Sequence, residues 1–299
     1  MKSIVPRLIK AALEEDVGAG DVTTGAVLTG EEVGSAQAVA KSALVVAGVD
    51  VFKEVFLFWD GDLKFTGFRE DGQMAAPGDV LAEISGKLGS ILTAERVALN
   101  FFQRMCGIAT MTRQYSEEIK GTQAKILDTR KTAPGLRVLD RYAVRIGGGF
   151  NHRFGLYDCV LIKDNHIAAA GGISRVVSRV RDRIPHTLKV EVEVKNLREV
   201  EEAITSAVDV IMLDNMSISE MREAVSLVRG RIPLEASGGV NLSNVKQIAE
   251  TGVDFISVGV LTHSVTASDI SLQVKGSGGG GDGEGHAPSW PLRWVREQD

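Results

Sequence analysis

Cationic side chains that could bind an anion gather in residues 128–153, the stretch DTRKTAPGLRVLDRYAVRIGGGFNHR. It holds five arginines, one lysine and one histidine but only two acids, in a chain whose formal net charge is -5. An acidic chain argues against a general nucleic-acid or membrane-surface binder, which is normally basic over a whole face or domain. Arginine forks match the geometry of carboxylates and phosphates, and lysine supplies a point charge. We therefore predict a site for a small ligand with several anionic groups, lined by Arg130, Lys131, His152, Arg153 and Lys163.

Three further arginines of this stretch allow a second interpretation. Residues 134–149, PGLRVLDRYAVRIGGG, predict a helix that begins near a proline and ends at three glycines. Arg137, Arg141 and Arg145 are four residues apart and share one face of this helix, where like charges repel. For these three, a solvated face paired with acids stays open beside a role in anion binding.

Two acids lie among the cations. Glu193 and Asp214 each end an apolar run, in KVEVEV and VDVIMLDN. Hard oxygen ligands without a Cys/His cluster favour Mg²⁺ bridged to substrate oxygens, and the same charges would stabilise a cationic transition state. Ion pairs with the arginines are the alternative. A paired acid and base, as in a glycosidase, would leave the arginine cluster without a purpose.

Two loops of small residues also suit an anion. Ser237, Gly238 and Gly239 follow one apolar run, and Ser257 and Gly259 stand at the end of the next. Small residues let backbone N–H groups approach an oxyanion closely. Loops after the last strands of a βα barrel are a recurrent phosphate site. Ordinary turns are the alternative for each loop alone, but two in succession favour a phosphate.

Short apolar runs alternating with helical segments must position these residues. From about residue 125 the runs are AKILD, CVLIKDN, KVEVEV, VDVIMLDN, IPLEASGG and VDFISVG. Continuous apolar strands alternating with helices indicate parallel strands covered on both faces. Six such units predict an α/β fold with an incomplete βα barrel, and an open doubly wound sheet is the alternative.

The first third of the chain has a different pattern. Residues 35–47 and 79–85 resemble strands, whereas VDVFKEVFLFW and AERVALNFFQRMCGIATMTRQY resemble helices. We expect an N-terminal α/β domain over residues 1–107, a barrel domain over 108–272 and a flexible glycine-rich tail over 273–299.

The two cysteines, Cys106 and Cys159, are far apart and lie among apolar residues, so we expect buried free thiols in a reducing, cytoplasmic compartment. The first residues carry acids before any long apolar run, unlike a signal peptide. No apolar run approaches the roughly 20 residues needed to span a bilayer.

The motifs closely resemble those of the quinolinate phosphoribosyltransferase family. The resemblance rests on residues 128–153 together with LIKDNHI, KVEVEV, IMLDN, EASGGVNLSNV and DFISVGVLTHS, and it runs from LEEDVGAGDVTT to about residue 272. It implies a reaction in which quinolinate and 5-phosphoribosyl 1-pyrophosphate give nicotinate mononucleotide, pyrophosphate and carbon dioxide in de novo NAD synthesis. It further implies Mg²⁺ with no organic cofactor, and an N-terminal α/β sandwich joined to an incomplete barrel.

The resemblance also implies roles for individual residues. The expected quinolinate-binding residues are Arg130, His152, Arg153 and Lys163, with Arg96 supplied by the neighbouring subunit of a homodimer or an assembly of dimers. Lys131 is expected to contact the phosphoribosyl substrate, Glu193 and Asp214 to face the ribose and its metal, and the two serine-glycine loops to hold the 5-phosphate. The catalytic residues are expected to be Lys131, Lys163, Glu193 and Asp214.

Two other functions stay open from the sequence. A phosphoribosyltransferase acting on nicotinate would recognise only one carboxylate, and the excess of cations argues against it. A non-catalytic phosphate- or nucleotide-binding module would have no use for Glu193 and Asp214 among the cations.

Overall fold

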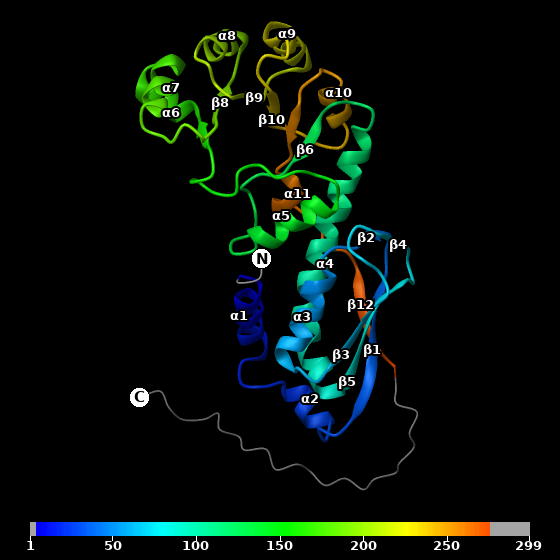
Figure 1. Cartoon of the computed structure of the whole chain (residues 1–299). Coiled ribbons are helices and arrows are strands. Elements are labelled where there is room, and N and C mark those ends of the chain that lie inside the picture. The colour runs from blue at the N-terminus through cyan, green and yellow to red at the C-terminus, as the bar shows by residue number, and fades with distance from the viewer. Residues whose placement is uncertain (1–3, 276–299) are drawn as a thin grey trace, which may run out of the picture.

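The N-terminal part of the chain is an antiparallel sheet with helices packed against it (Figure 1). A computed structural model describes residues 4–275. The sheet has the order β12-β1-β5-β3, formed by β1 (Val33–Ala40), β3 (Lys64–Gly67), β5 (Val80–Lys87) and β12 (Ile270–Lys275). The remaining elements here are α1 (Val5–Val17), α2 (Val22–Val27), α3 (Val49–Trp59), β2 (Leu44–Val45) and β4 (Met74–Ala75).

One long helix, α4 (Leu88–Glu118), joins the two parts of the molecule. Its 31 residues span roughly 46 Å at about 1.5 Å per residue. Near its middle, Phe102 stacks on Phe52 of α3 with ring centroids 4.8 Å apart. Two residues later, Arg104 binds Asp140 in the barrel. The prediction of a long helix leading from the first domain into the barrel is confirmed.

The second part is a six-stranded parallel sheet with the order β6-β11-β10-β9-β8-β7. Its strands are β6 (Lys125–Leu127), β7 (Val160–Ile162), β8 (Val190–Val194), β9 (Val210–Asp214), β10 (Leu234–Ser237) and β11 (Phe255–Ser257). Its helices are α5 (Arg137–Ile146), α6 (Asp164–Ala170), α7 (Ile173–Arg181), α8 (Leu197–Thr205), α9 (Ile218–Val228), α10 (Val245–Ala249) and α11 (Val260–His263). All six predicted strands occur, and the prediction of an incomplete barrel beside a separate N-terminal α/β domain is confirmed.

The barrel is incomplete between its edge strands β6 and β7. On the free side of β6, Phe150 forms an isolated parallel bridge with Leu127. Residues 150–153 therefore extend the sheet beyond β6 without forming a full strand. This short segment carries His152 and Arg153 to the mouth of the barrel.

The end of the barrel chain differs from the predicted domain ranges. Strand β12 returns to the N-terminal sheet, where Ile270 pairs with Ala40 and Lys275 pairs with Ser35. Residues 270–272 thus lie outside the barrel, and residues 273–275 are part of a strand rather than of a tail. A short strand at the edge of a distant sheet has no local sequence signal, because its partner is more than 200 residues away. The rest of the predicted tail, residues 276–299, lies outside the described residues.

Within residues 4–275, every helix falls short of the length and apolar character that a bilayer span requires.

Candidate active site

The predicted functional residues lie at the carboxyl ends of the parallel strands. Alternation along β8 explains how: Val190, Val192 and Val194 are fully buried on one face, so Glu191 and Glu193 share the opposite face. Each following loop continues from the same end of its strand. The sheet therefore gathers on one rim the residues Arg130, Lys131, Lys163, Glu193, Asp214, Ser237, Gly238, Gly239, Ser257 and Gly259.

Two guanidinium groups, that of Arg130 on the rim and that of Arg153 beside it, lie near each other. Burial lowers the pKa of Arg153, and the positive charge of Arg130 lowers it further. Arg153 donates one hydrogen bond, from Nη1 to the carbonyl of Cys159 at 3.1 Å. Among residues 4–275, no hydrogen bond or ion pair engages the guanidinium of Arg130. Neither guanidinium forms an ion pair among residues 4–275, although Glu191 and Asp158 lie near Arg153, and two neighbouring cations without ion pairs favour an anionic ligand.

Lys131 lies beside the second small-residue loop. A Cβ atom added to Gly259 would be 3.3 Å from Cδ of Lys131, so the two residues are in contact. The carbonyl of Lys131 accepts a 2.9 Å hydrogen bond from Oγ1 of Thr262 in α11, which fixes the backbone of Lys131 next to that helix. This places the predicted phosphate contact at the predicted phosphate loop.

The first small-residue loop needs glycine for steric reasons. Gly238 and Gly239 have φ of +94° and +62°, a region that L side chains rarely adopt. A Cβ on Gly238 would also overlap the side chain of Asn215, which follows β9. The loop is therefore packed tightly against the end of the neighbouring strand, with its backbone exposed along the rim.

Ser257 differs from the other predicted phosphate residues. It is 6% exposed, and its hydroxyl donates to Oε1 of Glu235 in β10. The side chain of Ser257 is thus engaged inside the barrel. Only the backbone of the residue 257–259 loop remains for a phosphate.

Glu193 and Lys163 form the closest ion pair of the rim. Nζ of Lys163 lies 2.5 Å from Oε2 of Glu193, and the Glu193 side chain is only 10% exposed. Asp214, on the next strand, pairs in register with Ser237 of β10 and accepts a 3.0 Å hydrogen bond from the Asn215 amide. Two carboxylates on adjacent strands provide the hard oxygen ligands that Mg²⁺ prefers, so the donor set fits that ion.

The three arginines of α5 support the loops of the site. Arg137 donates to the carbonyls of Phe154 and Arg130, and Arg141 donates to the carbonyl of Arg153 and to Asp128. Arg145 stacks on the Phe150 ring with its guanidinium carbon 4.8 Å from the centroid. Arg141 pairs with an acid and Arg145 is exposed, as one interpretation of this helix face expected, and a role of these arginines in anion binding stays a prediction. These cations hold the chain segments that carry Arg130 and Arg153.

Asp128 binds the segment of residues 150–153 and helix α5 through its side chain. Its carboxylate is fully buried and accepts hydrogen bonds from Arg141 at 3.3 Å, from the Asn151 amide at 2.5 Å and from the His152 backbone at 2.8 Å. Burial raises the pKa of Asp128, while the charge of Arg141 opposes that rise. One buried acid therefore links α5 to the segment that extends the sheet beyond β6.

His152 has partners in the chain at both ring nitrogens. Nδ1 accepts a 2.7 Å hydrogen bond from the backbone N–H of Arg153, and Nε2 lies 3.1 Å from Oε2 of Glu191. Burial lowers the pKa of His152, but the hydrogen bond to Glu191 and the nearby negative charge outweigh burial and raise it. A nitrogen that accepts a hydrogen bond carries no proton, so the observed bonding assigns the neutral Nε2–H tautomer. Both ring nitrogens thus have partners within the chain, and the predicted contact of His152 with substrate stays a prediction.

Glu191 and Glu235 form the floor of the site; the sequence places Glu235 at a strand end without a role, and Glu191 was not singled out. They are 3% and 2% exposed, and His152, Glu191 and Glu235 place one polar atom each within 4.8 Å of one another. Hydrogen bonds account for the close approaches, and we assign no metal to this trio. The available signal was a charged residue in the middle of a strand whose neighbours are buried valines.

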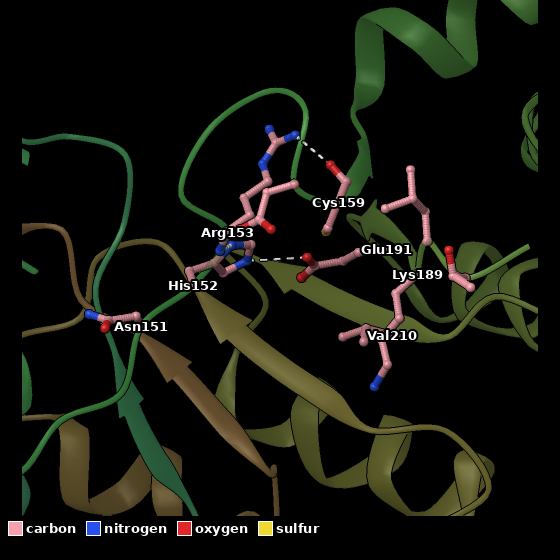
Figure 2. A pocket seen from close by; sticks show the side chains of 10 residues that line it. Asn151, His152, Arg153, Cys159, Lys189, Glu191 and Val210 are labelled. Carbon is pink, nitrogen blue, oxygen red and sulfur yellow. Dashed lines mark hydrogen bonds and ion pairs between the residues drawn. The ribbon is translucent and has the colours of Figure 1, made fainter. Parts of the chain in front are cut away.

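A cavity of about 300 Å³ reaches the same floor. It is bordered by His152, Arg153 and Glu191 together with residues that precede β7 and β8, among them Cys159 and Lys189 (Figure 2). The cavity therefore lies toward the amino ends of these strands, away from the small-residue loops. Cys159, which we predicted to be buried, is partly exposed here, while Cys106 is buried as expected; both thiols are free.

Arg96 is the one predicted site residue that the fold does not bring to the rim. It lies in α4 eight residues before Arg104, or about 12 Å along the helix axis, and Arg104 is already at the level of α5. Its side chain is exposed. Within residues 4–275, no ion pair joins Arg96 to a rim residue.

Comparisons with known proteins show the family of the chain. Residues 21–106 match the family described as quinolinate phosphoribosyl transferase, N-terminal domain, and residues 108–273 match its C-terminal domain. A probable nicotinate-nucleotide pyrophosphorylase (carboxylating) of Bacillus subtilis is 44% identical over 90% of this chain and 92% of its own length. One from Synechocystis is 46% identical over 91% of this chain and 92% of its own length. The solved nicotinate-nucleotide pyrophosphorylase of Francisella tularensis is 42% identical, has a TM-score of 0.89 and covers 92% of this chain and 97% of that one.

Proposed function

Because the chain belongs to the quinolinate phosphoribosyltransferase family in both of its domains, we propose that the rim is where its two substrates react. The chain is a decarboxylating phosphoribosyltransferase. It converts quinolinate and phosphoribosyl pyrophosphate to nicotinate mononucleotide, pyrophosphate and carbon dioxide in NAD synthesis.

The two neighbouring guanidinium groups carry the assignment of the quinolinate subsite. Arg130 and Arg153 repel each other, and neither forms an ion pair among residues 4–275. A pyridine with two adjacent carboxylates would satisfy both, with Lys163 close to the same rim through its bond to Glu193. Fixing the carboxylates orients the ring nitrogen toward the sugar, which supplies the proximity that a two-substrate reaction needs.

The phosphoribosyl substrate fits the other side of the rim. The backbones of Gly238, Gly239 and Gly259 would approach the 5-phosphate, and Lys131, in contact with Gly259, would add positive charge. Glu193 and Asp214, on adjacent strands, would face the space between the two subsites. Their negative charge would stabilise the cationic character that the ribosyl carbon develops as pyrophosphate leaves.

Decarboxylation needs little further help from the protein. Alkylation of the ring nitrogen makes the pyridine ring cationic. That charge stabilises the electron pair left on the adjacent carbon when its carboxylate departs as carbon dioxide, so the proposal requires no organic cofactor.

We further propose that Mg²⁺ accompanies phosphoribosyl pyrophosphate. Glu193 and Asp214 would hold it, directly or through substrate oxygens or water, since both offer carboxylate oxygens at strand ends. When bound, the ion offsets the charge of the departing pyrophosphate. The free thiols of Cys106 and Cys159 support a reducing, cytoplasmic setting.

The purified chain is expected to form nicotinate mononucleotide and carbon dioxide from quinolinate, phosphoribosyl pyrophosphate and Mg²⁺. Both products should be followed, with nicotinate replacing quinolinate in a parallel reaction. Nicotinate should give little product, because it has one carboxylate for two guanidinium groups. Product from nicotinate alone would move the chain to the sister activity, and no product from either, in a folded protein, would favour a binding role.

A shared site between subunits explains the position of Arg96. We propose that the chain works as a homodimer or a larger assembly of dimers in which Arg96 of one copy completes the quinolinate subsite of another. Arg96→Ala and Lys163→Ala should each be nearly inactive alone. Mixed dimers should recover activity, because one of their two sites holds both intact residues, which gives about a quarter of wild-type activity for random pairing. Verified mixed dimers without recovery would contradict the shared site.

A further inference from the structure

Four polar side chains form a continuous string inside the barrel, beneath the rim. Ser257 of β11 donates its hydroxyl to Oε1 of Glu235 in β10. The carboxylates of Glu235 and of Glu191 in β8 have oxygens within 4.8 Å of each other, and Nε2 of His152 lies 3.1 Å from Glu191 and 3.5 Å from Glu235. Figure 2 shows the contact between His152 and Glu191, with the His152 ring directed at the Glu191 carboxylate beside the cavity.

The string has too few donors if both carboxyl groups are ionised. The donors are one Ser257 hydroxyl, directed at Glu235, and one His152 N–H, because Nδ1 of that ring already accepts from Arg153. Oε1 of Glu191 is buried and has no hydrogen-bond partner among the described residues. A buried carboxylate oxygen without a donor costs stability and calls for an explanation.

A proton on Glu235 removes this deficit. Two buried carboxylates in contact cannot both stay ionised at low cost. Glu191 is the nearer acceptor for His152, at 3.1 Å against 3.5 Å for Glu235, so Glu235 is the better position for the proton. Burial first, and then the charge of Glu191, raise the pKa of Glu235 to about 8, against the opposing effects of His152 and Ser257. Glu235 as a neutral carboxyl can donate to Glu191.

The geometry points to Glu235 as a protonated positioning residue that, through Glu191, locks His152 and the backbone of Arg153 in the orientation that binds quinolinate. This inference rests on the proposed function for the identity of the ligand. Arg153 needs such a lock, because the charge of Arg130 pushes against it.

The other charged or titratable groups near the string leave this assignment unchanged. Cys159 faces it from the start of β7, and burial and then the charge of Glu191 raise the pKa of this thiol to about 11, so it stays neutral. Arg153 faces it as a cation from the segment beyond β6. From β9, the residue in register with Glu235 is Met212, which carries no charge.

The test compares Glu235→Gln, Glu235→Ala and the wild-type enzyme between pH 6 and 9.5, measuring KM for quinolinate and kcat separately. Glutamine keeps the shape and the donor of a protonated carboxyl. Glu235→Gln should stay within about threefold of wild type at neutral pH, whereas Glu235→Ala should raise KM for quinolinate by about tenfold or more, the cost of a hydrogen bond to a charged group. Wild-type KM should rise as the pH passes through about 8, where Glu235 loses its proton, and Glu235→Gln should lack this rise.

A second measurement does not depend on activity. Between the ordinary glutamate pKa of 4.5 and about 8, folded Glu235 keeps a proton that the unfolded chain releases. Stability must therefore fall as pH rises through this window. The Tm of the wild type should fall from pH 5 to pH 8 more steeply than the Tm of Glu235→Gln, and this holds even if quinolinate proves not to be the substrate.

Three outcomes would overturn the proposal. One is a pH profile of KM and Tm in Glu235→Gln that matches the wild type. Another is a Glu235→Gln enzyme that is folded at neutral pH but has a KM for quinolinate as high as that of Glu235→Ala. The negative charge of Glu235, rather than its proton, would then be needed. The third is a stoichiometric metal ion, found by elemental analysis in the wild type and absent from Glu235→Gln.

Discussion

Lys163→Ala is expected to lower kcat/KM for quinolinate by about 10²- to 10³-fold, the range found when one preorganised electrostatic group is removed from an active site. The change removes a cation from the rim. It also strips Glu193 of its partner at 2.5 Å, and that carboxylate is only 10% exposed. A nearly buried charge left alone repels the anionic substrates and disturbs the strand end that holds it.

Steady-state kinetics with both substrates varied would measure this loss. Arg181→Ala is the matched control, because Arg181 forms a 2.6 Å ion pair with Asp209, whose side chain is 35% exposed. Asp209 precedes β9 and so lies at the opposite end of the sheet. The control should change kcat/KM by less than about threefold, since a partly exposed ion pair far from the rim contributes little to stability or activity. A loss below tenfold for Lys163→Ala in a folded protein would remove Lys163 from the catalytic residues.

Asp140→Ala is expected to destabilise the fold by about 3–5 kcal/mol, the cost of breaking a buried ion pair from one side. Asp140 is fully buried and binds Arg104 through both oxygens, at 2.8 and 2.7 Å. Arg104 also donates to the carbonyl of Thr262. One pair thus joins α4 to α5 and α11, so its loss leaves an uncompensated arginine between the two domains.

The midpoint of urea unfolding, followed by circular dichroism, would report this loss. Glu117→Ala is the control on the same helix, because its 3.1 Å pair with Lys120 is exposed, at 56% and 78% of the two side chains. Removing an exposed pair should leave the midpoint nearly unchanged. An Asp140→Ala midpoint equal to that of the control would show that the pair does not hold the domains together.

The sequence was most informative where one local rule decides the outcome. Six apolar runs predicted six parallel strands, because a strand buried on both faces must be apolar along its length. The polar residue after each run then fell at the rim, since parallel strands end on one side. Lys163 and Glu193 were placed there by this rule and turned out to be bonded to each other.

Features that depend on distant partners could not be predicted. The spacing of Arg137, Arg141 and Arg145 gave their shared helix face but not the carbonyls and the ring that they contact. Glu191 is visible as a charge in a buried strand, yet its importance depends on Glu235, 44 positions later, lying beside it. Pairing across strands is set by the register of the whole sheet rather than by either residue.

The return of β12 to the first domain has a consequence for the order of folding during synthesis. The ribosome makes β1 and β5 early, but the neighbour of β1 on its other side is completed only at Lys275. Until then the row of backbone groups along that edge of β1 is uncovered, and uncovered edges pair with other chains. The first domain to be synthesised is therefore the last to be finished, and the barrel must fold beside an incomplete partner before its own end can close the sheet.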